Sequence, residues 1–112
     1  MFSIVLLGSC NKYSKKVAGT YTGQMTINDS IISSNVNIII SEISNKRISV
    51  ASDFFPTYEL EIEKQRYFTS VTYYNSDDSE RLEIGEAATG LYLTCSHYDN
   101  LNNKYTFSGE RN

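Results

Sequence analysis

The chain has 112 residues, with 13 acidic and 10 basic side chains and a net charge of −3. This length is typical of one domain, and it can bury one modest core. Lysine and arginine are scattered along the chain and form no basic stripe with aromatic residues between them. We therefore expect a single small domain, and we expect no nucleic-acid partner.

The N-terminus carries the most specific motif. Residues 2–7 are apolar and uncharged, and Leu7-Gly8-Ser9-Cys10 follows. The run is too short to cross a bilayer, which takes about 20 residues, but it is typical of the end of a secretory signal peptide. The tetrapeptide resembles the bacterial lipobox, which implies cleavage before Cys10 and lipidation of its thiol. Two or three acyl chains hold a protein firmly at a membrane; an ordinary N-terminal strand with a buried cysteine is the alternative.

The residues around this motif complete the expected domain organisation. No basic residue precedes Cys10, so we expect the true leader to be longer. Residues 11–16 (NKYSKK) are polar and basic, which predicts a flexible tether. Lipoproteins exported to the outer face of some Gram-negative cells carry acidic residues here, whereas this chain has lysines. We expect a signal-peptide remnant at 1–9, a lipidated cysteine and tether at 10–16, and a barrel domain at 17–112. The anchor would lie in the outer membrane, with the domain on the periplasmic side.

From Val17 onward the hydrophobic pattern has a period of two, which indicates half-buried strands. Threonine, serine, isoleucine and tyrosine are abundant there and favour strands over helices. Eight strands are predicted, at 17–27, 35–42, 47–52, 58–63, 67–74, 81–85, 91–96 and 105–109. Their short spacing indicates an antiparallel meander. Closing it into an all-β, eight-stranded up-and-down barrel removes both open edges, and at this size side chains just fill the interior.

The first and last predicted strands carry a family resemblance. The first contains Gly19-x-Tyr21-x-Gly23, and the last contains Phe107-x-Gly109. These first and last strands resemble those of the small calycin-like (lipocalin-like) lipoproteins of Gram-negative gut bacteria, and the resemblance covers most of residues 17–110. The resemblance implies an eight-stranded barrel in the periplasm or at the cell surface, with no agreed activity and no catalytic residue to carry over.

Aromatic residues are the candidates for binding. A tyrosine presents an apolar ring with a polar tip, which suits a pocket or an interface. The four candidate ligand-contacting tyrosines are Tyr21, Tyr58, Tyr92 and Tyr105. The alternative is that they pack in the core or at the barrel rim. Pro56 interrupts the strand pattern at 53–57 (DFFPT). This predicts a loop that presents Phe54 and Phe55 to a protein partner, or folds them over one end of the barrel.

Polar groups give weaker candidates. Glu59, Glu61 and Glu63 share one strand face at a spacing of about 6.5–7 Å, which suits paired acid and base groups, but a solvated outer face is favoured. Residues 77–80 (DDSE) lack the ligand spacing and glycine of a known calcium loop and indicate a hairpin tip. Asp29-Ser30-Ile31 resembles a tripeptide that some Gram-negative gut bacteria O-glycosylate, which makes Ser30 a candidate for modification.

His97 and Cys95 are the remaining candidate reactive groups. His97 is the single histidine, and Ser96 beside it would point to the opposite face of a strand, so no catalytic triad is indicated. Cys95 fits a small buried hydrophobe, and a metal site would need more cysteine or histidine. We therefore expect no enzyme, metal or cofactor. The expected function is a lipid-anchored binding module for a small apolar ligand or a protein partner, or alternatively an inhibitor acting through 53–57.

Overall fold

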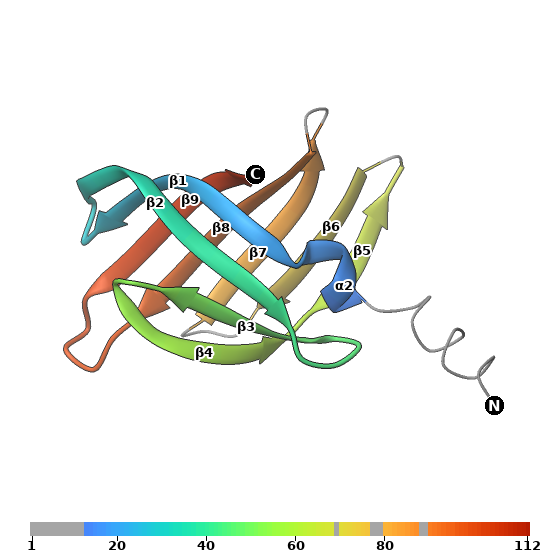
Figure 1. Cartoon of the computed structure of the whole chain (residues 1–112), viewed down its shortest axis with the longest axis horizontal. Helices are drawn as coiled ribbons and strands as arrows, with labels where there is room; N and C mark the ends of the chain where they lie inside the picture. The colour runs from blue at the N-terminus through green and yellow to red at the C-terminus, as the bar shows by residue number, and fades with distance from the viewer. Residues whose placement is uncertain (1–12, 69, 77–79, 88–89) are drawn as a thin grey trace.

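The computed structural model describes residues 13–68, 70–76, 80–87 and 90–112. Cys10, the proposed leader and residues 77–79 of the candidate calcium loop lie outside them. Nine antiparallel strands form one sheet that curls into a nearly closed barrel (Figure 1). The predicted all-β up-and-down architecture is therefore confirmed, with nine strands instead of eight.

The sheet order is β4-β3-β2-β1-β9-β8-β7-β6-β5. Apart from β4 and β5, strands that are neighbours in the chain are thus neighbours in the sheet, and β1 pairs with β9 to join the first strand to the last. The strands are β1 (Gly19–Ile27), β2 (Ser30–Glu42), β3 (Arg47–Ser52), β4 (Phe55–Glu61), β5 (Glu63–Tyr67), β6 (Ser70–Ser76), β7 (Glu80–Ala87), β8 (Gly90–Tyr98) and β9 (Lys104–Arg111).

The extra strand arises at a turn that the sequence pattern does not reveal. The strand predicted at 67–74 is interrupted at Phe68, which has a φ of 56°. The chain reverses there, so Tyr67 pairs with Ser70 and β5 lies antiparallel to β6. Positive φ in a hairpin turn normally selects glycine, asparagine or aspartate. A phenylalanine at this position gives no turn signal, and the prediction of one strand was wrong for this reason.

The barrel is nearly closed because one stretch of chain spans its seam. Strands β4 and β5 lie at the two edges of the sheet, yet only Ile62 separates them in the chain. The Ile62 amide donates to the Lys46 carbonyl at 2.8 Å. The Asn75 side-chain amide donates to the Glu61 carbonyl at 2.7 Å. These two bonds tie the end of β4 to both sides of the seam.

Two predicted loops are shorter than expected. Strand β2 begins at Ser30 rather than at residue 35, because Asn28 and Asp29 adopt positive φ and complete a tight turn. The predicted 53–57 loop is reduced to a turn at Asp53 and Phe54, and β4 already begins at Phe55. Proline is tolerated at position 56 because β4 is an edge strand.

Apolar side chains fill the interior of the barrel. Alternate residues of the strands point inward, and the largest fully buried ones are Tyr21, Met25, Ile38, Ile40, Ile48, Ile62, Leu82, Ile84, Leu93 and Phe107. Filling of this kind is expected for a small barrel. Binding surfaces are therefore to be sought at its two ends and on its outer face.

A short helix, α2 (Tyr13–Val17), closes one end of the barrel. Ser14 and Val17 are fully buried, the Ser14 amide donates to the Asn45 carbonyl at 3.0 Å, and the Tyr21 hydroxyl donates to the Val17 carbonyl at 2.7 Å. The flexible tether predicted for 11–16 is therefore wrong over residues 13–16, because tertiary contacts order a segment whose own composition is polar.

The two ends of the barrel differ in structure. We call the end with α2, the turn at 43–46 and the paired Tyr67 and Ser70 of β5 and β6 the helix end. The opposite end has the turns at 28–29, 53–54 and 99–103, and we call it the histidine end because it holds His97. In Figure 1 the helix end lies on the right and the histidine end on the left.

Candidate functional site

His97 forms a close pair with Glu80 at the histidine end. The two residues face each other across β7 and β8. The histidine Nδ1 lies 2.6 Å from one carboxylate oxygen of Glu80 and 2.7 Å from the other. A carboxylate in this position takes a hydrogen bond from Nδ1 and fixes the orientation of the ring. This pair was not predicted from the sequence, because both residues lie one position outside the predicted strands at 81–85 and 91–96.

Aromatic rings surround the His97 imidazole. Tyr58 stacks on it, with ring centroids 4.9 Å apart and an interplanar angle of 12°. Phe55 lies 4.7 Å away and Tyr105 6.1 Å away, centroid to centroid. Phe55 is 7% exposed and folds over the mouth of the barrel, whereas Phe54 is 37% exposed and points outward. The two phenylalanines predicted as one contact surface therefore have different surroundings.

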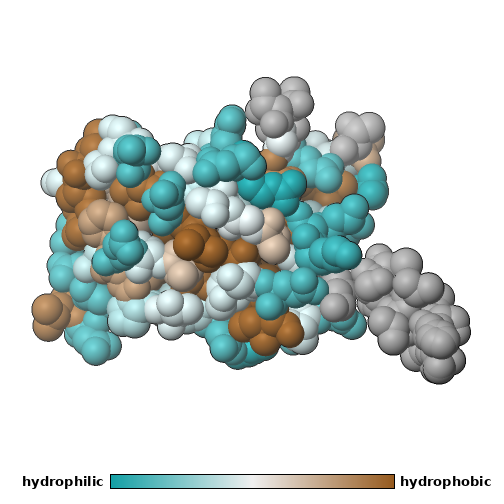
Figure 2. All heavy atoms as spheres, viewed as in Figure 1, coloured by the Kyte–Doolittle hydropathy of each residue, from teal (hydrophilic) through white to brown (hydrophobic). Residues whose placement is uncertain are grey.

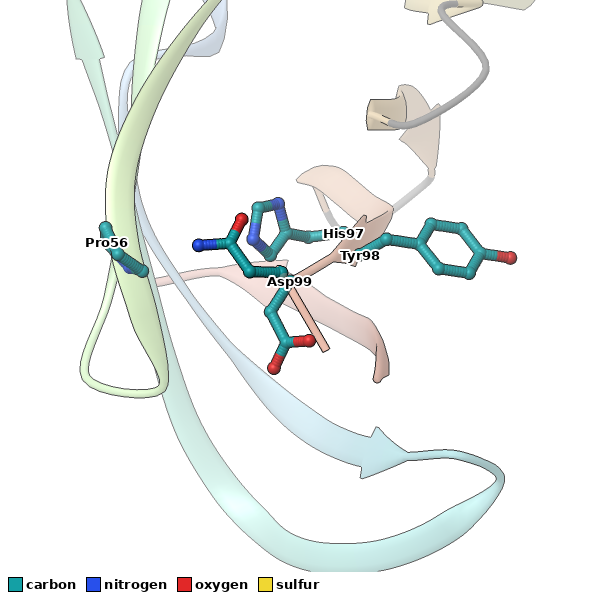
Figure 3. Close-up of a pocket in the computed structure, with 5 residues that line it drawn as sticks. Pro56, His97, Tyr98 and Asp99 are labelled. Atoms are coloured by element: carbon teal, nitrogen blue, oxygen red, sulfur yellow. The ribbon is translucent and has the colours of Figure 1, made fainter. Parts of the chain in front are cut away.

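A small pocket opens beside this cluster. Its volume is about 160 Å³, and Figure 3 shows Pro56 of β4 on one side and His97 and Asp99 on the other, with Tyr98 pointing away. Pockets for drug-sized ligands span roughly 300–1,000 Å³. This pocket is therefore the right size for one amino-acid side chain or a group of similar bulk.

Hydrogen bonds hold the 99–103 turn that borders the pocket. Asp99 Oδ1 accepts the amides of Leu101 and Asn103 at 2.8 and 2.9 Å. Asp99 Oδ2 accepts the Tyr105 hydroxyl at 3.2 Å. Hydrogen bonds to the carboxylate lower the pKa of Asp99 below its ordinary value, and the bond from the Asn103 amide has the largest effect. The pocket is thus edged by a fixed, ionised carboxylate.

The Cys95 thiol, two residues before His97 on β8, bears on possible chemistry. Burial, followed by the charge of Glu80, raises the pKa of the Cys95 thiol to about 12. A reactive cysteine needs a lowered pKa, so Cys95 is not an activated nucleophile. Among the residues that the structure describes, no group of three or more His, Cys, Asp or Glu side chains could hold a metal ion.

The other predicted site residues lie elsewhere. Tyr21 is fully buried in the core, and burial raises its pKa to about 12. Tyr92 lies on the outer face of β8, so the structure brings together only Tyr58 and Tyr105 of the four tyrosines. Ser30 is exposed at the start of β2. The predicted carboxylate row lies on the solvated outer face, where Glu59 contacts Arg47 at 3.0 Å and Glu63 contacts Lys46 at 3.5 Å.

Tyr58 provides a test of the cluster. Its hydroxyl is buried and has no hydrogen-bond partner among the described residues, and such a group costs about 1–3 kcal/mol. We expect Tyr58→Phe to raise the free energy of unfolding by about 1 kcal/mol at neutral pH. The pKa of Tyr58 is raised in the folded protein, and burial is the main cause. Above about pH 10 the tyrosine of the unfolded chain therefore loses its proton while that of the folded chain keeps it. The wild type therefore loses stability there, and the advantage of the variant should widen.

Urea denaturation of both proteins at pH 7 and pH 10.5 measures this difference. A variant that is less stable at pH 7 would contradict an unpartnered hydroxyl.

Comparisons of the chain with models of protein families, with curated proteins and with solved structures find no match. In the part of the chain that the structure describes, no helix has the length and apolar character needed to cross a membrane.

Proposed function

We propose that this chain is a lipid-anchored, non-enzymatic binding module of the cell envelope, and that it engages a protein partner at its histidine end. The observation that carries the proposal is the histidine-end rim, which we define as Phe54, Tyr98 and Leu101. These side chains are 37%, 42% and 81% exposed. Phe54 and Leu101 lie on the turns at 53–54 and 99–103, and Tyr98, the last residue of β8, lines the side-chain-sized pocket. Large apolar and aromatic side chains beside a pocket are typical anchors of protein interfaces.

At the histidine end, the size of the pocket favours a protein side chain over a small apolar ligand. A volume of about 160 Å³ accepts one side chain of a partner, whereas drug-sized ligands need roughly 300–1,000 Å³. Acidic side chains next to the rim, Asp53 and Asp99, would favour basic groups on the partner. Calycin-like barrels are one of several folds that can present such a rim.

The N-terminal motif supports the lipid anchor. Leu7-Gly8-Ser9-Cys10 resembles a lipobox, and α2 begins only three positions after Cys10. An anchor at Cys10 would hold the helix end toward the membrane and leave the histidine end facing away from it. The resemblance to small periplasmic or surface lipoproteins supports the same arrangement.

Site-specific photo-crosslinking in the native host tests the partner site. A benzophenone amino acid placed at Phe54 or at Leu101 retains an apolar group in the rim. We expect both positions to crosslink to the same envelope protein, and we expect no such adduct from Glu83, which is exposed on the wall of β7. Leu101→Ser should weaken the adduct from position 54 several-fold. Equal adducts from all three positions, or none, would contradict a partner at the histidine end.

Native mass spectrometry distinguishes the remaining alternatives. An extra mass that disappears on denaturation would instead favour a small apolar ligand. An inhibitor role is the second candidate, because Phe54 lies at the exposed tip of a tight turn. It would be favoured if the crosslinked protein is a hydrolase that the wild-type domain inhibits and Phe54→Ala does not.

A further inference from the structure

Two aromatic side chains stand in solvent at the helix end. Tyr67 is 69% exposed and Phe68 is 82% exposed, and their rings meet edge to face with centroids 4.5 Å apart. Phe68 also adopts a φ of 56°, which is unfavourable for a bulky side chain. Neither the exposure nor the backbone conformation of Phe68 helps the barrel to fold. Both features suggest that the side chain contacts something outside the barrel.

Basic side chains flank this aromatic pair. Helix α2 carries Lys15 and Lys16, both exposed, and no acidic residue. On β5, Lys64 and Arg66 are exposed and lie opposite Tyr73 and Val71, which places them on the inner side of the sheet at the barrel mouth. Figure 2 shows hydrophilic residues gathered beside α2 at this end of the molecule.

The acidic side chain of β5 does not cancel this charge. Glu63 contacts Lys46 of the neighbouring turn at 3.5 Å, so α2 and β5 keep an excess of positive charge over the surface next to the aromatic pair. The histidine end, by contrast, presents the acidic Asp29, Asp53 and Asp99 at its turns. The positive charge is local to α2 and β5, because Glu61 and Glu86 also lie at the helix end and Lys104 lies at the histidine end.

We propose that the helix end is a docking surface for an anionic lipid bilayer. Tyr67 and Phe68 would enter the interfacial layer, where aromatic side chains are favoured, and the lysine and arginine side chains would contact acidic headgroups. The proposal rests on the proposed function, because the anchor at Cys10 brings the bilayer to this end. Three residues of extended chain span about 10 Å, so α2 lies within about one Debye length of the headgroups.

Vesicle binding of the full chain with Cys10→Ser tests the surface without an acyl anchor. The vesicles contain phosphatidylcholine alone or mixed with phosphatidylglycerol, and bound protein is measured by sedimentation. We expect binding to the mixed vesicles that falls with rising salt. Lys15→Gln with Lys16→Gln should weaken it about 25-fold at low salt, at about fivefold for each cation. Binding to phosphatidylcholine alone should not change.

The aromatic pair is tested by Phe68→Asn. Asparagine tolerates positive φ, so this variant should unfold at the same temperature as its parent or a higher one. Its vesicle binding should nevertheless fall about tenfold, because an apolar ring no longer leaves water. Ile31→Ser, at the opposite end, is the matched control, because Ile31 is 64% exposed and lies outside the histidine-end rim; it should bind as the parent does. All variants share residues 2–7, so any contribution of that apolar run cancels in the comparison.

The outcomes separate the docking surface from the anchor. The docking surface is overturned if Phe68→Asn binds like its parent, or if Ile31→Ser weakens binding as much as Phe68→Asn does. Incorporation of labelled palmitate into the wild-type chain but not into Cys10→Ser supports the anchor. If the wild type is labelled but Cys10→Ser shows no preference for anionic vesicles, docking is overturned and the anchor stands. If that preference is found without labelling, docking stands and the anchor is overturned.

Discussion

Replacing Gly23 with alanine should lower the free energy of unfolding by about 3 kcal/mol, at the upper end of the usual 1–3 kcal/mol cost of overpacking, because the added atom meets backbone. A Cβ at Gly23 would lie 1.9 Å from the Ser108 carbonyl oxygen and 2.5 Å from the Gly109 Cα. Both are backbone atoms of β9, so relief requires the strand itself to move. Gly23 and Gly109 are direct partners in the β1–β9 pair, the one that joins the first strand to the last.

Urea denaturation followed by circular dichroism measures the loss. Gly109→Ala should behave similarly, since its Cβ would lie 2.4 Å from the Thr22 carbonyl oxygen. Gly85→Ala on β7 is the matched control, because the nearest atom to its added Cβ is the Thr72 hydroxyl at 4.0 Å. A similar loss from Gly85→Ala would show that β propensity or strand flexibility, rather than close approach of β1 to β9, explains the effect.

The period-two pattern was sufficient to predict the barrel. It placed Leu91, Leu93 and Cys95 on one face, and all three are buried. The same pattern put Leu60 and Ile62 inside and the neighbouring glutamates outside, as the structure has them. These predictions succeed because burial on one face of a strand imposes alternation locally. The sequence could not predict helix α2, because a five-residue helix has too few positions for a periodic pattern and depends on its contact with Asn45.

The candidate site could not be predicted from the hydrophobic pattern of single strands, for a related reason. Phe55, Glu80 and His97 come from three separate strands, and their meeting depends on sheet register and barrel curvature. Strand ends are also the least certain part of a sequence-based prediction, and Glu80 and His97 lie there. The exact register of β7 on β8, once known, places these two side chains directly opposite each other. The sequence signal for this pair was a glutamate and a histidine near the ends of two strands that follow each other in the chain.

Phe55→Ala is expected to lower the free energy of unfolding by about 3–4 kcal/mol, the usual cost of truncating a buried phenylalanine. Phe55 contacts the rings of Tyr58, His97 and Tyr105 and covers the mouth of the barrel. Its neighbour Phe54 provides an internal control, because it has the same chemistry but stands in solvent. Phe54→Ala should change stability by no more than about 0.5 kcal/mol.

The pair of variants separates the structural part of the histidine end from the part that contacts a partner. Thermal and urea unfolding should identify Phe55 as core, while crosslinking from Leu101 to the partner should fall in Phe54→Ala at unchanged stability. If Phe54→Ala proves as destabilising as Phe55→Ala, both rings belong to the core and the rim loses its central member. If Phe55→Ala folds normally yet abolishes crosslinking, the ring moves out to meet the partner, and the pocket beside His97 enlarges on binding.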